Sequence, residues 1–289
     1  MTRANDAAHE TGGAWRARVT GDGTFTLVHP LHGQACHSSA GAWLEARERY
    51  VAGARIPERL REPGRTQLAL LDVGTGLGLN LAALFERARS SGVALRVLTL
   101  ERDVAVLERA FELFAGDGPA PRALDATARD SLRAVHAALA RALASRAAVP
   151  FGPRGRLELR VGDARRTLAA RPPAERFDAV FLDPFSPGVE PELWEPRFLR
   201  EIARRMAAGS VLATYCAATR VRVALAACGL RVGAGTRLGR KAEGTLAAPD
   251  VDLAPLAPRV ARRLARRAPE LCRELGWPVP APYRADHAP

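Results

Sequence analysis

Short apolar runs alternate with amphipathic stretches through most of the chain. The run QLALLDVG, residues 67–74, is apolar and ends in glycine, which is typical of a buried parallel strand. The stretch LNLAALFERARSSG, residues 79–92, follows with helical spacing and ends in glycine. A second strand at 94–103 and a second helix at 104–116 repeat the unit. This alternation predicts a parallel sheet with right-handed crossovers.

The same alternation continues to about residue 250 and predicts one α/β domain. Further helices are predicted at 130–147, from 164 to about 170, at 195–210 and at 219–229, and further strands at 156–163, 177–183, 211–217, 230–235 and 244–248. The segment 115–127 is rich in Gly, Pro and Ala and is predicted to be a loop.

The two ends of the chain differ from this pattern. Polar and apolar residues alternate around GDGTFTLVHP, which predicts a hairpin that turns at Gly21-Asp22-Gly23, and residues 41–53 have helical spacing. We therefore expect an N-terminal cap with its first helix at 1–55, a Rossmann-like domain at 56–257 and a basic helical C-terminal tail at 258–289.

Composition indicates an ordinary folded protein. The chain has 289 residues, of which 47% are hydrophobic, and no run of about 18 apolar residues that would span a membrane. Four cysteines lie far apart without a CxxC pair, and the six histidines show no ligand spacing, so we expect neither a metal site nor a disulfide scaffold. The first residues, MTRANDAAHE, lack an apolar signal region. We expect a cytoplasmic protein without membrane contact.

The charge permits a nucleic-acid partner without requiring one. The net charge is +12, and 42 of the 43 basic residues are arginine, a bias that a GC-rich genome also produces. Arginine clusters at 231–241 and 258–267 have the chemistry for phosphate contacts. A solvated loop and a solvated helix face would give the same pattern.

A glycine-rich turn joins the first predicted strand to its helix. Asp72 precedes Gly74, Gly76 and Gly78, which alternate with other residues. Glycine allows positive φ and close approach of a ligand, and a helix N-terminus favours negative groups. The turn therefore predicts a nucleotide-type cofactor site. No GKS or GKT follows, which excludes a P-loop, and no second mononucleotide half follows either.

Carboxylates stand at the ends of several predicted strands. Glu101 can accept hydrogen bonds from both hydroxyls of a ribose, and Asp163 can accept one from an adenine amino group. Because ligands of open α/β sheets bind at the carboxyl ends of the strands, Asp72, Glu101, Asp163 and Asp183 are expected to converge on one crevice.

A proline-rich segment follows the strand that ends at Asp183. Three prolines in Asp183-Pro-Phe-Ser-Pro-Gly-Val-Glu-Pro-Glu-Leu-Trp194 fix the backbone, so that Asp183 and Phe185 are held in a set geometry. The carboxylate of Asp183 can orient an amine, and the ring of Phe185 can stack on a nucleobase. We expect Trp194 to pack on the core.

The combination of DVGTGLGLN, LERD, VGDA, LDPFSPGVEPELW, ATYCAATRVRVAL and GRKAEGTLA resembles the MnmC-like methyltransferase family. The similarity extends to TFTLVHPLHGQACHSSAGAWLEARERYV and the final PYRAD, so that it spans about residues 20–285. The resemblance implies a class I methyltransferase fold, S-adenosylmethionine as cofactor, and methylation of the 5-aminomethyl group on the wobble (2-thio)uridine of tRNA.

The resemblance also implies roles for single residues. Gly74, Gly76 and Gly78 correspond to the cofactor loop, Glu101 to the ribose ligand, Asp163 to the adenine ligand, and Asp183 with Phe185 to the catalytic site. Glu45 matches an acid of the family's first helix, and Arg240 and Lys241 match a basic pair that would contact the substrate RNA. Pro184 stands where the family usually has Gly or Ala. We expect a stand-alone methyltransferase domain without the oxidase domain of the bifunctional members, and the resemblance then implies that another tRNA-modifying enzyme supplies the amine.

Three other functions stay open. An aminopropyltransferase of the spermidine-synthase kind has the same glycine turn and acids, and a methyltransferase that acts on a small-molecule or protein amine shares the fold. A catalytically silent nucleotide- or RNA-binding module is the third. A polyamine pocket needs several carboxylates, whereas a tRNA site needs a basic rim. The oligomeric state is left open.

Overall fold

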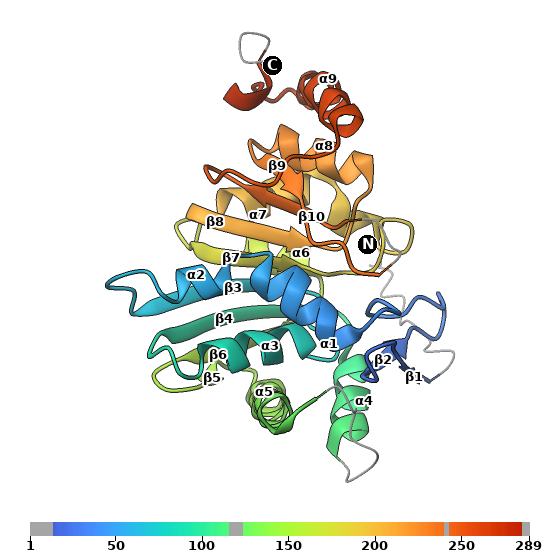
Figure 1. Cartoon of the computed structure of the whole chain (residues 1–289), viewed down its shortest axis with the longest axis vertical. Coiled ribbons are helices and arrows are strands. Elements are labelled where there is room, and N and C mark those ends of the chain that lie inside the picture. The colour runs from blue at the N-terminus through green and yellow to red at the C-terminus, as the bar shows by residue number, and fades with distance from the viewer. Residues whose placement is uncertain (1–13, 116–123, 240–242, 285–289) are drawn as a thin grey trace, which may run out of the picture.

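A computed structural model describes residues 14–115, 124–239 and 243–284. Its centre is an eight-stranded sheet with the order β5-β6-β4-β3-β7-β8-β10-β9, and β1 and β2 form a separate two-stranded sheet (Figure 1). The five strands from β6 to β8 are parallel, and β5, β10 and β9 pair antiparallel at the two edges. The predicted α/β fold with a mostly parallel sheet is confirmed.

The strands follow the predicted apolar runs. Their bounds are β1 Arg16–Val19, β2 Phe25–Val28, β3 Gln67–Val73, β4 Ala94–Glu101, β5 Val149–Pro150, β6 Arg156–Val161, β7 Phe177–Leu182, β8 Met206–Thr214, β9 Arg231–Ala234 and β10 Thr245–Ala248. The short β5 lies in a segment with breaker residues, forms one edge of the sheet and pairs only with β6.

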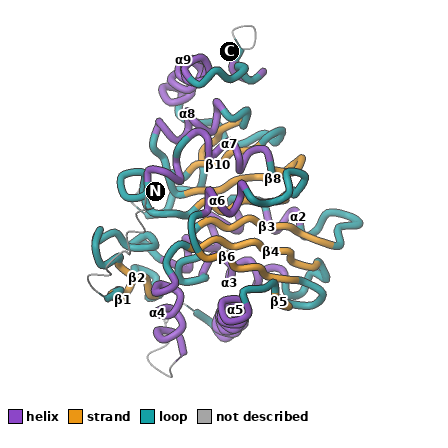
Figure 2. Tube along the Cα trace, turned by 180° about the vertical axis from the view of Figure 1, so that it is seen from behind, coloured by secondary structure: helices purple, strands orange, loops and turns teal. Residues whose placement is uncertain are grey.

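Helices cover both faces of the sheet. Their bounds are α1 Ala42–Leu44, the π-helix η1 Glu45–Ala52, α2 Ile56–Arg59, α3 Leu79–Ala88, α4 Val104–Ala115, α5 Ala126–Ser145, α6 Ala164–Ala169, the 3₁₀ turn η2 Pro191–Trp194, α7 Pro196–Arg204, α8 Thr219–Ala227, α9 Pro258–Glu274 and the 3₁₀ turn η3 Ala281–Tyr283. Helices η1, α3 and α5 pack together on one face, and α6, α7 and α8 lie on the other (Figures 1 and 2). None of the described helices has the length and apolar character to cross a membrane.

Strand periodicity divides the core between the two faces. Leu68 and Leu70 of β3 belong to the apolar cluster under η1, α3 and α5, whereas Ala69 and Leu71 belong to the cluster under α6 and α7. All four side chains are at most 5% exposed. Each fully buried leucine contributes about 1.5–3 kcal/mol to folding. The continuous apolar run of β3 is therefore explained by burial on both faces.

The N-terminal cap has the predicted hairpin. β1 and β2 pair antiparallel, and the N–H of Gly23 donates to the carbonyl of Thr20 at 2.9 Å within the turn. The predicted helix at 41–53 begins as α1 and continues as a π-helix over Glu45–Ala52. In a π-helix each hydrogen bond spans one residue more than in an α-helix, and the spacing of apolar residues did not predict this difference. Such π-helical turns occur often at functional sites.

The helix predicted over 195–210 ends at Arg204, so the last part of that prediction is wrong. Met206 pairs with Phe177 and begins β8. The guanidinium of Arg205 is buried and donates to the carbonyls of Leu168 and Arg171 at 2.8 and 3.1 Å. Sheet pairing and these bonds override the helical preference of the MAA sequence.

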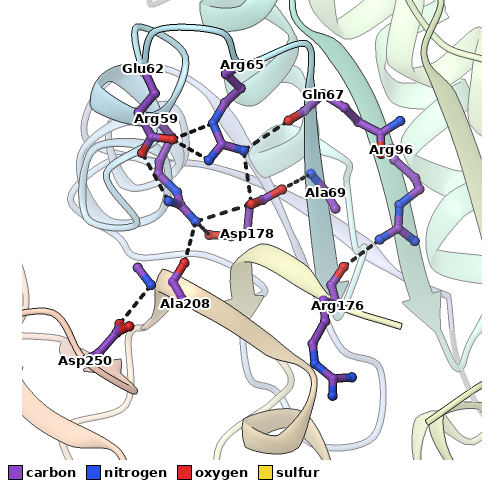
Figure 3. Close-up of polar contacts among 11 residues, drawn as sticks. Arg59, Glu62, Arg65, Gln67, Ala69, Arg96, Arg176, Asp178, Ala208 and Asp250 are labelled. Atoms are coloured by element: carbon purple, nitrogen blue, oxygen red, sulfur yellow. Dashed lines mark hydrogen bonds and ion pairs between the residues drawn. The ribbon is translucent and has the colours of Figure 1, made fainter. Parts of the chain in front are cut away.

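A network of hydrogen bonds and ion pairs around Asp178 joins the amino-terminal ends of neighbouring strands (Figure 3). Asp178 of β7 accepts hydrogen bonds from Arg59 and Arg65 at 3.3 and 3.1 Å and from the N–H of Ala69 at 2.8 Å. Arg59 also donates to the carbonyl of Ala208 at 3.3 Å. One side chain thus joins α2, β3, β7 and the segment that follows α2.

Asp178→Ala is expected to lower the free energy of unfolding by about 2 kcal/mol, because it removes one acceptor from each of two arginines and the side-chain acceptor of the Ala69 N–H. Urea unfolding measures the change, and the m-value should stay the same. Asp130→Ala is the matched control, since Asp130 forms an exposed pair with Arg133 at 3.0 Å that contributes less than about 1 kcal/mol. Equal losses in the two variants would contradict the structural role of Asp178.

Candidate active site

A cavity of about 610 Å³ lies where the carboxyl ends of β3, β4, β6 and β7 meet. The turns after these four strands form one wall, and the cap contributes Trp15, His29 and Gln34 to another. The predicted residues that line the cavity are Gly74, Gly76, Glu101, Asp163, Asp183 and Phe185. Strand ends that are far apart in the sequence therefore converge as the fold class predicts.

The glycine turn depends on conformations that favour glycine. Gly74 has φ +90°, and a Cβ built on it would lie 2.6 Å from the carbonyl oxygen of Asp183. Gly76 has φ +51° and no atom within 4 Å of such a Cβ. Gly78 precedes α3 and faces Leu139 of α5 at 3.3 Å instead of the cavity. Two of the three glycines thus shape the cavity, and the third allows helix packing.

Glu101 is fixed to the glycine turn. Its carboxylate accepts from the N–H groups of Gly76 at 2.9 Å, Arg102 at 2.7 Å and Asp103 at 3.0 Å. Burial raises the pKa of Glu101 to about 7 despite these bonds. A carboxylate has about four acceptor positions. Ligand hydroxyls at this position would therefore share the carboxylate with the turn.

Asp163 begins α6 and lies at the cavity wall. It accepts from the N–H of Arg165 at 2.8 Å and pairs with the Arg165 guanidinium at 2.7 Å. The hydrogen bond from the Arg165 side chain holds the pKa of Asp163 below its usual value. This carboxylate is anionic near neutral pH and can accept from an amino group.

The structure does not bring Asp72 into the cavity. The side chain is 1% exposed and accepts from the Thr99 hydroxyl at 2.6 Å, behind the glycine turn. Alternation along β3 places it on the same face as Leu70, which belongs to the apolar cluster under η1, α3 and α5. Thr99 in turn shares a 2.6 Å hydrogen bond with Thr75 of the turn. Its placement supports a role in holding the turn, not the predicted direct contact with a cofactor.

Two neutral donors hold the carboxylate of Asp183. Tyr50 of η1 donates to Oδ1, and Asn80 of α3 donates to Oδ2 at 2.8 Å. Burial, and then the charge of Glu45, raise the pKa of Asp183 well above its usual range, whereas the bonds from Tyr50 and Asn80 oppose this change. Burial raises the pKa of Tyr50 as well, so its phenol remains a donor.

Glu45 lies behind the cavity instead of in its lining. Its carboxylate accepts from the N–H of Ser38 at 2.6 Å and from Arg49 at 2.7 Å. Its influence on the site is therefore electrostatic, through Asp183. Arg240 and Lys241, the predicted substrate-binding pair, lie outside the described residues, and their role stays a prediction.

Aromatic rings from the cap and from the segment after β7 form one wall. Phe185 stacks on Trp15 with ring centroids 6.2 Å apart and meets the edge of His29 at 5.2 Å. The N–H of Phe185 donates to Glu190 at 2.9 Å, and its carbonyl accepts from the Trp194 indole at 2.7 Å. Trp194 is buried, which confirms its predicted packing role. The wall is held on both sides of Phe185.

Sequence reasoning missed Tyr50, Asn80, Trp15, His29 and Tyr215 as residues of the site. Asn80 stands within the glycine motif, and an amide in the first turn of a buried helix is a signal that was available. Tyr50 gave no such signal, because its contact with Asp183 joins residues 133 positions apart. Trp15 and His29 reach the wall only because the cap folds over the sheet edge.

The cavity lining is strongly acidic. Eight carboxylates and three arginines contribute to it, a formal charge of −5: Glu101, Asp103, Glu108, Glu112, Asp163, Asp183, Glu190, Glu192, Arg102, Arg109 and Arg165. The arginines pair with Glu192, Glu112 and Asp163 at 2.7–3.0 Å. The remaining charge favours cationic ligands. Among the described residues, no group of three or more His, Cys, Asp or Glu side chains is arranged to hold a metal ion.

These residues fit a cationic nucleoside cofactor. The turn at Gly76 leaves open space where a side chain would otherwise stand, acceptors for hydroxyl and amino groups lie at Glu101 and Asp163, and an unbalanced carboxylate lies at Asp183. S-adenosylmethionine has this combination of ribose, adenine and positive charge.

Comparison with known proteins agrees with the geometry. A family model described as S-adenosyl-L-methionine-dependent methyltransferase matches residues 127–250. The chain is 32% identical over 232 residues to the tRNA 5-methylaminomethyl-2-thiouridine biosynthesis bifunctional protein MnmC of Methylibium petroleiphilum, which covers 75% of this chain and 32% of that protein. This chain thus spans about a third of the length of the curated relatives that it matches.

Solved structures give the same result. The crystal structure of MNMC2 from Aquifex aeolicus superposes with a TM-score of 0.72 and 29% identity, over 89% of this chain and 78% of that one. A probable spermidine synthase from Corynebacterium glutamicum has a TM-score of 0.50 and 17% identity over 92% of this chain and 85% of that one, which shows a shared fold alone. The chain is therefore similar to the MnmC proteins, and its family-model match and its fold are those of S-adenosyl-L-methionine-dependent methyltransferases.

Proposed function

We propose that this protein transfers the methyl group of S-adenosylmethionine to the 5-aminomethyl group of wobble (2-thio)uridine in tRNA. The observation that carries the proposal is the Asp183 carboxylate, held by two neutral donors at the wall of an acidic cavity and followed by an aromatic ring. The names of the curated relatives support this acceptor. A tRNA substrate would place the activity in the cytoplasm, downstream of an enzyme that supplies the amine.

The bound cofactor supplies an electrophilic methyl group on a sulfonium. In the proposed site, Gly74 and Gly76 let it approach the backbone, Glu101 binds the ribose and Asp163 the adenine amino group. Residues 56–257 form the catalytic domain in this proposal, residues 1–55 cap it, and 258–289 form a basic tail.

Asp183 orients the acceptor amine and takes its proton. A neutral amine is the nucleophile, so the nitrogen lone pair forms the new N–C bond while the C–S electron pair returns to sulfur. The nitrogen then carries one proton in excess, and the Asp183 carboxylate accepts it. Holding the amine in line with the methyl group is the main contribution of the enzyme, since such alignment replaces an encounter in solution.

The aromatic wall holds the base. Phe185, stacked on Trp15, offers a face on which an extruded pyrimidine can stack, a contact that contributes about 1–3 kcal/mol per base. The acid-rich lining attracts the protonated form of the acceptor amine, which releases a first proton to solvent and then reacts as the neutral amine.

The acidic lining also favours a second candidate, an aminopropyltransferase. A polyamine acceptor needs several carboxylates, and the formal charge of −5 supplies them. Decarboxylated S-adenosylmethionine with putrescine, assayed beside S-adenosylmethionine with tRNA, separates the two functions. Transfer only in the first pair would replace our proposal.

The direct test uses labelled S-adenosylmethionine and tRNA from cells that lack wobble aminomethyl methylation. After digestion, we expect the label in the methylaminomethyl-uridine nucleoside. Label in a small amine or a protein amine instead would retain the cofactor and change the acceptor. Cofactor binding without transfer to any acceptor would indicate a silent binding module.

Tyr50→Phe is expected to move the acidic limb of the kcat/KM profile to higher pH. The reaction needs ionised Asp183, which exists above the pKa of that carboxyl, and the Tyr50 hydrogen bond lowers this pKa. Removal of the bond therefore raises the pKa of Asp183 and lowers kcat/KM roughly tenfold at pH values on the acidic limb. A pH series of kcat/KM with tRNA measures the shift.

Two other tyrosines provide controls. Tyr215→Phe removes a phenol that donates to the carbonyl of Pro184 at 3.0 Å, not to the carboxylate, so the limb should keep its position. Tyr283→Phe removes a phenol that donates to the carbonyl of Leu230, outside the cavity lining. If the acidic limb stayed in place in Tyr50→Phe, Asp183 would not be the group whose ionisation sets that limb.

A further inference from the structure

The outer face of helix α9 carries a stripe of arginines. Six arginines and two glutamates occur in its 17 residues, a formal charge of +4. Arg259, Arg262, Arg263 and Arg266 are exposed, and none has an ion-pair partner among the described residues. Arg267, by contrast, pairs with Glu270 at 2.9 Å. We refer to Arg259, Arg262, Arg263 and Arg266 as the α9 arginine stripe.

The opposite face of α9 is fixed to the fold. Leu264 and Ala268 are buried in a cluster with Val223 and Ala226 of α8, and the Cys272 thiol lies 3.7 Å from the carbonyl oxygen of Ala227. The helix therefore cannot turn its apolar face outwards. An amphipathic helix that binds a membrane surface inserts that face among the lipids. The packing of α9 thus argues against a membrane as partner.

The arginines of the stripe repel one another, and a bound anion would relieve this repulsion. They are three and four residues apart, so they are neighbours on the helix surface, and like charges at this spacing each cost about 0.2–0.5 kcal/mol. No described acid compensates them. Guanidinium groups bind phosphate oxygens in pairs of hydrogen bonds, and a phosphate chain supplies successive anions to successive turns.

The stripe lies far from the cavity. The glycine turn follows β3, and β9 is four strand positions away at the edge of the sheet, which corresponds to about 19 Å at 4.8 Å per strand. Helix α9 packs outside α8 at that end of the molecule (Figure 1). The molecule therefore presents negative charge in the cavity and positive charge at one end. An RNA that carries an amine on one base and phosphates along its backbone has the complementary arrangement.

We propose that the α9 arginine stripe binds the phosphate backbone of the substrate RNA away from the base that enters the cavity. The identity of that RNA as tRNA rests on the proposed function. The stripe contributes to affinity and orientation, and it takes no part in methyl transfer, because phosphate contacts position a nucleic acid without reaching the reacting atoms.

The test compares two fourfold arginine-to-glutamine variants with the same change of charge. The first replaces Arg259, Arg262, Arg263 and Arg266. The second replaces Arg61, Arg87, Arg89 and Arg133, which are exposed and lie on or beside α2, α3 and α5. Glutamine preserves helix propensity, and far-UV circular dichroism with thermal unfolding verifies the fold of both. The Kd for unmodified tRNA is measured over a series of KCl concentrations.

In the α9 variant we expect the slope of log Kd against log salt to become shallower by about 3, since each lost phosphate contact removes about 0.7–0.9. The Kd at low salt should rise by roughly tenfold or more, and KM for tRNA should rise with it while kcat at saturation is retained. The control variant should keep most of the wild-type slope.

Several results would overturn the inference. Equal changes in both variants would mean that only total charge matters, and an unchanged slope in the α9 variant would exclude the stripe as an RNA contact. Loss of binding to vesicles with anionic lipids, with tRNA binding intact, would assign the stripe to membranes. If the stripe binds tRNA but the wild-type protein methylates none, the proposed function fails while this inference holds.

Discussion

Asp183→Asn is expected to lower kcat for tRNA methylation by about 10²–10⁴-fold, the range that a positioned general base contributes. The amide keeps the shape of the side chain and can still accept from Asn80 or Tyr50, but it cannot take the amine proton. The Kd for S-adenosylmethionine should change little, because the turn at Gly74 and Gly76 and the carboxylates of Glu101 and Asp163 remain. Single-turnover kinetics and calorimetric titration measure the two quantities.

Asp163→Asn gives the contrasting pattern. This residue lies at the cavity wall with a lowered pKa and no contact with Asp183, so its loss should raise the KM for the cofactor more than it lowers kcat. If Asp183→Asn turned over at the wild-type rate, the proton would have another acceptor and the proposed mechanism would be wrong.

The sheet and its cavity were predictable because they follow from local patterns. Apolar runs such as residues 67–73 have few alternatives to buried strands, and glycine and acidic residues at their ends must meet at one edge of a parallel sheet. For this reason Glu101, Asp163 and Asp183 were correctly expected to lie together. Asp72 was wrongly expected to lie with these residues. Alternation along β3 places its side chain on the buried face that also carries Leu70.

The partners of these residues depend on tertiary packing. Tyr50 reaches Asp183 because η1 crosses the sheet as a π-helix, and Trp15 reaches Phe185 because the cap hairpin folds over the strand ends. No spacing rule links such distant positions. The start of β8 at Met206 was hidden for a similar reason, since local helix propensity extends past Arg204 and only pairing with Phe177 ends the helix.

Gly74→Ala is expected to reduce both stability and turnover, because the glycine turn and the Asp183 segment are one packed unit. The new Cβ would lie 2.6 Å from the carbonyl oxygen and 2.9 Å from the carbonyl carbon of Asp183, and φ of +90° is unfavourable for alanine. Strain and overpacking each cost about 1–3 kcal/mol, so the free energy of unfolding should fall by about 2–6 kcal/mol. Urea unfolding measures this loss.

Two glycines nearby separate the causes. Gly76→Ala has a positive φ of +51° but meets no atom within 4 Å, so it should show backbone strain alone, about 1 kcal/mol. Gly188→Ala lies in the segment after β7 with only Ser186 Oγ at 3.9 Å and should be nearly neutral.

The effect of Gly74→Ala on turnover distinguishes a shifted carboxylate from a weakened fold. The N–H of Asp183 donates to the carbonyl of Val73 at 2.8 Å, so backbone at Gly74 and at Asp183 cannot separate without breaking β3 from the end of β7. A displacement of about 1 Å at the reacting groups costs on the order of 10²-fold in rate. We therefore expect kcat to fall by that factor at temperatures where the variant is fully folded. A folded variant with wild-type kcat would mean that the position of Asp183 does not depend on the glycine turn.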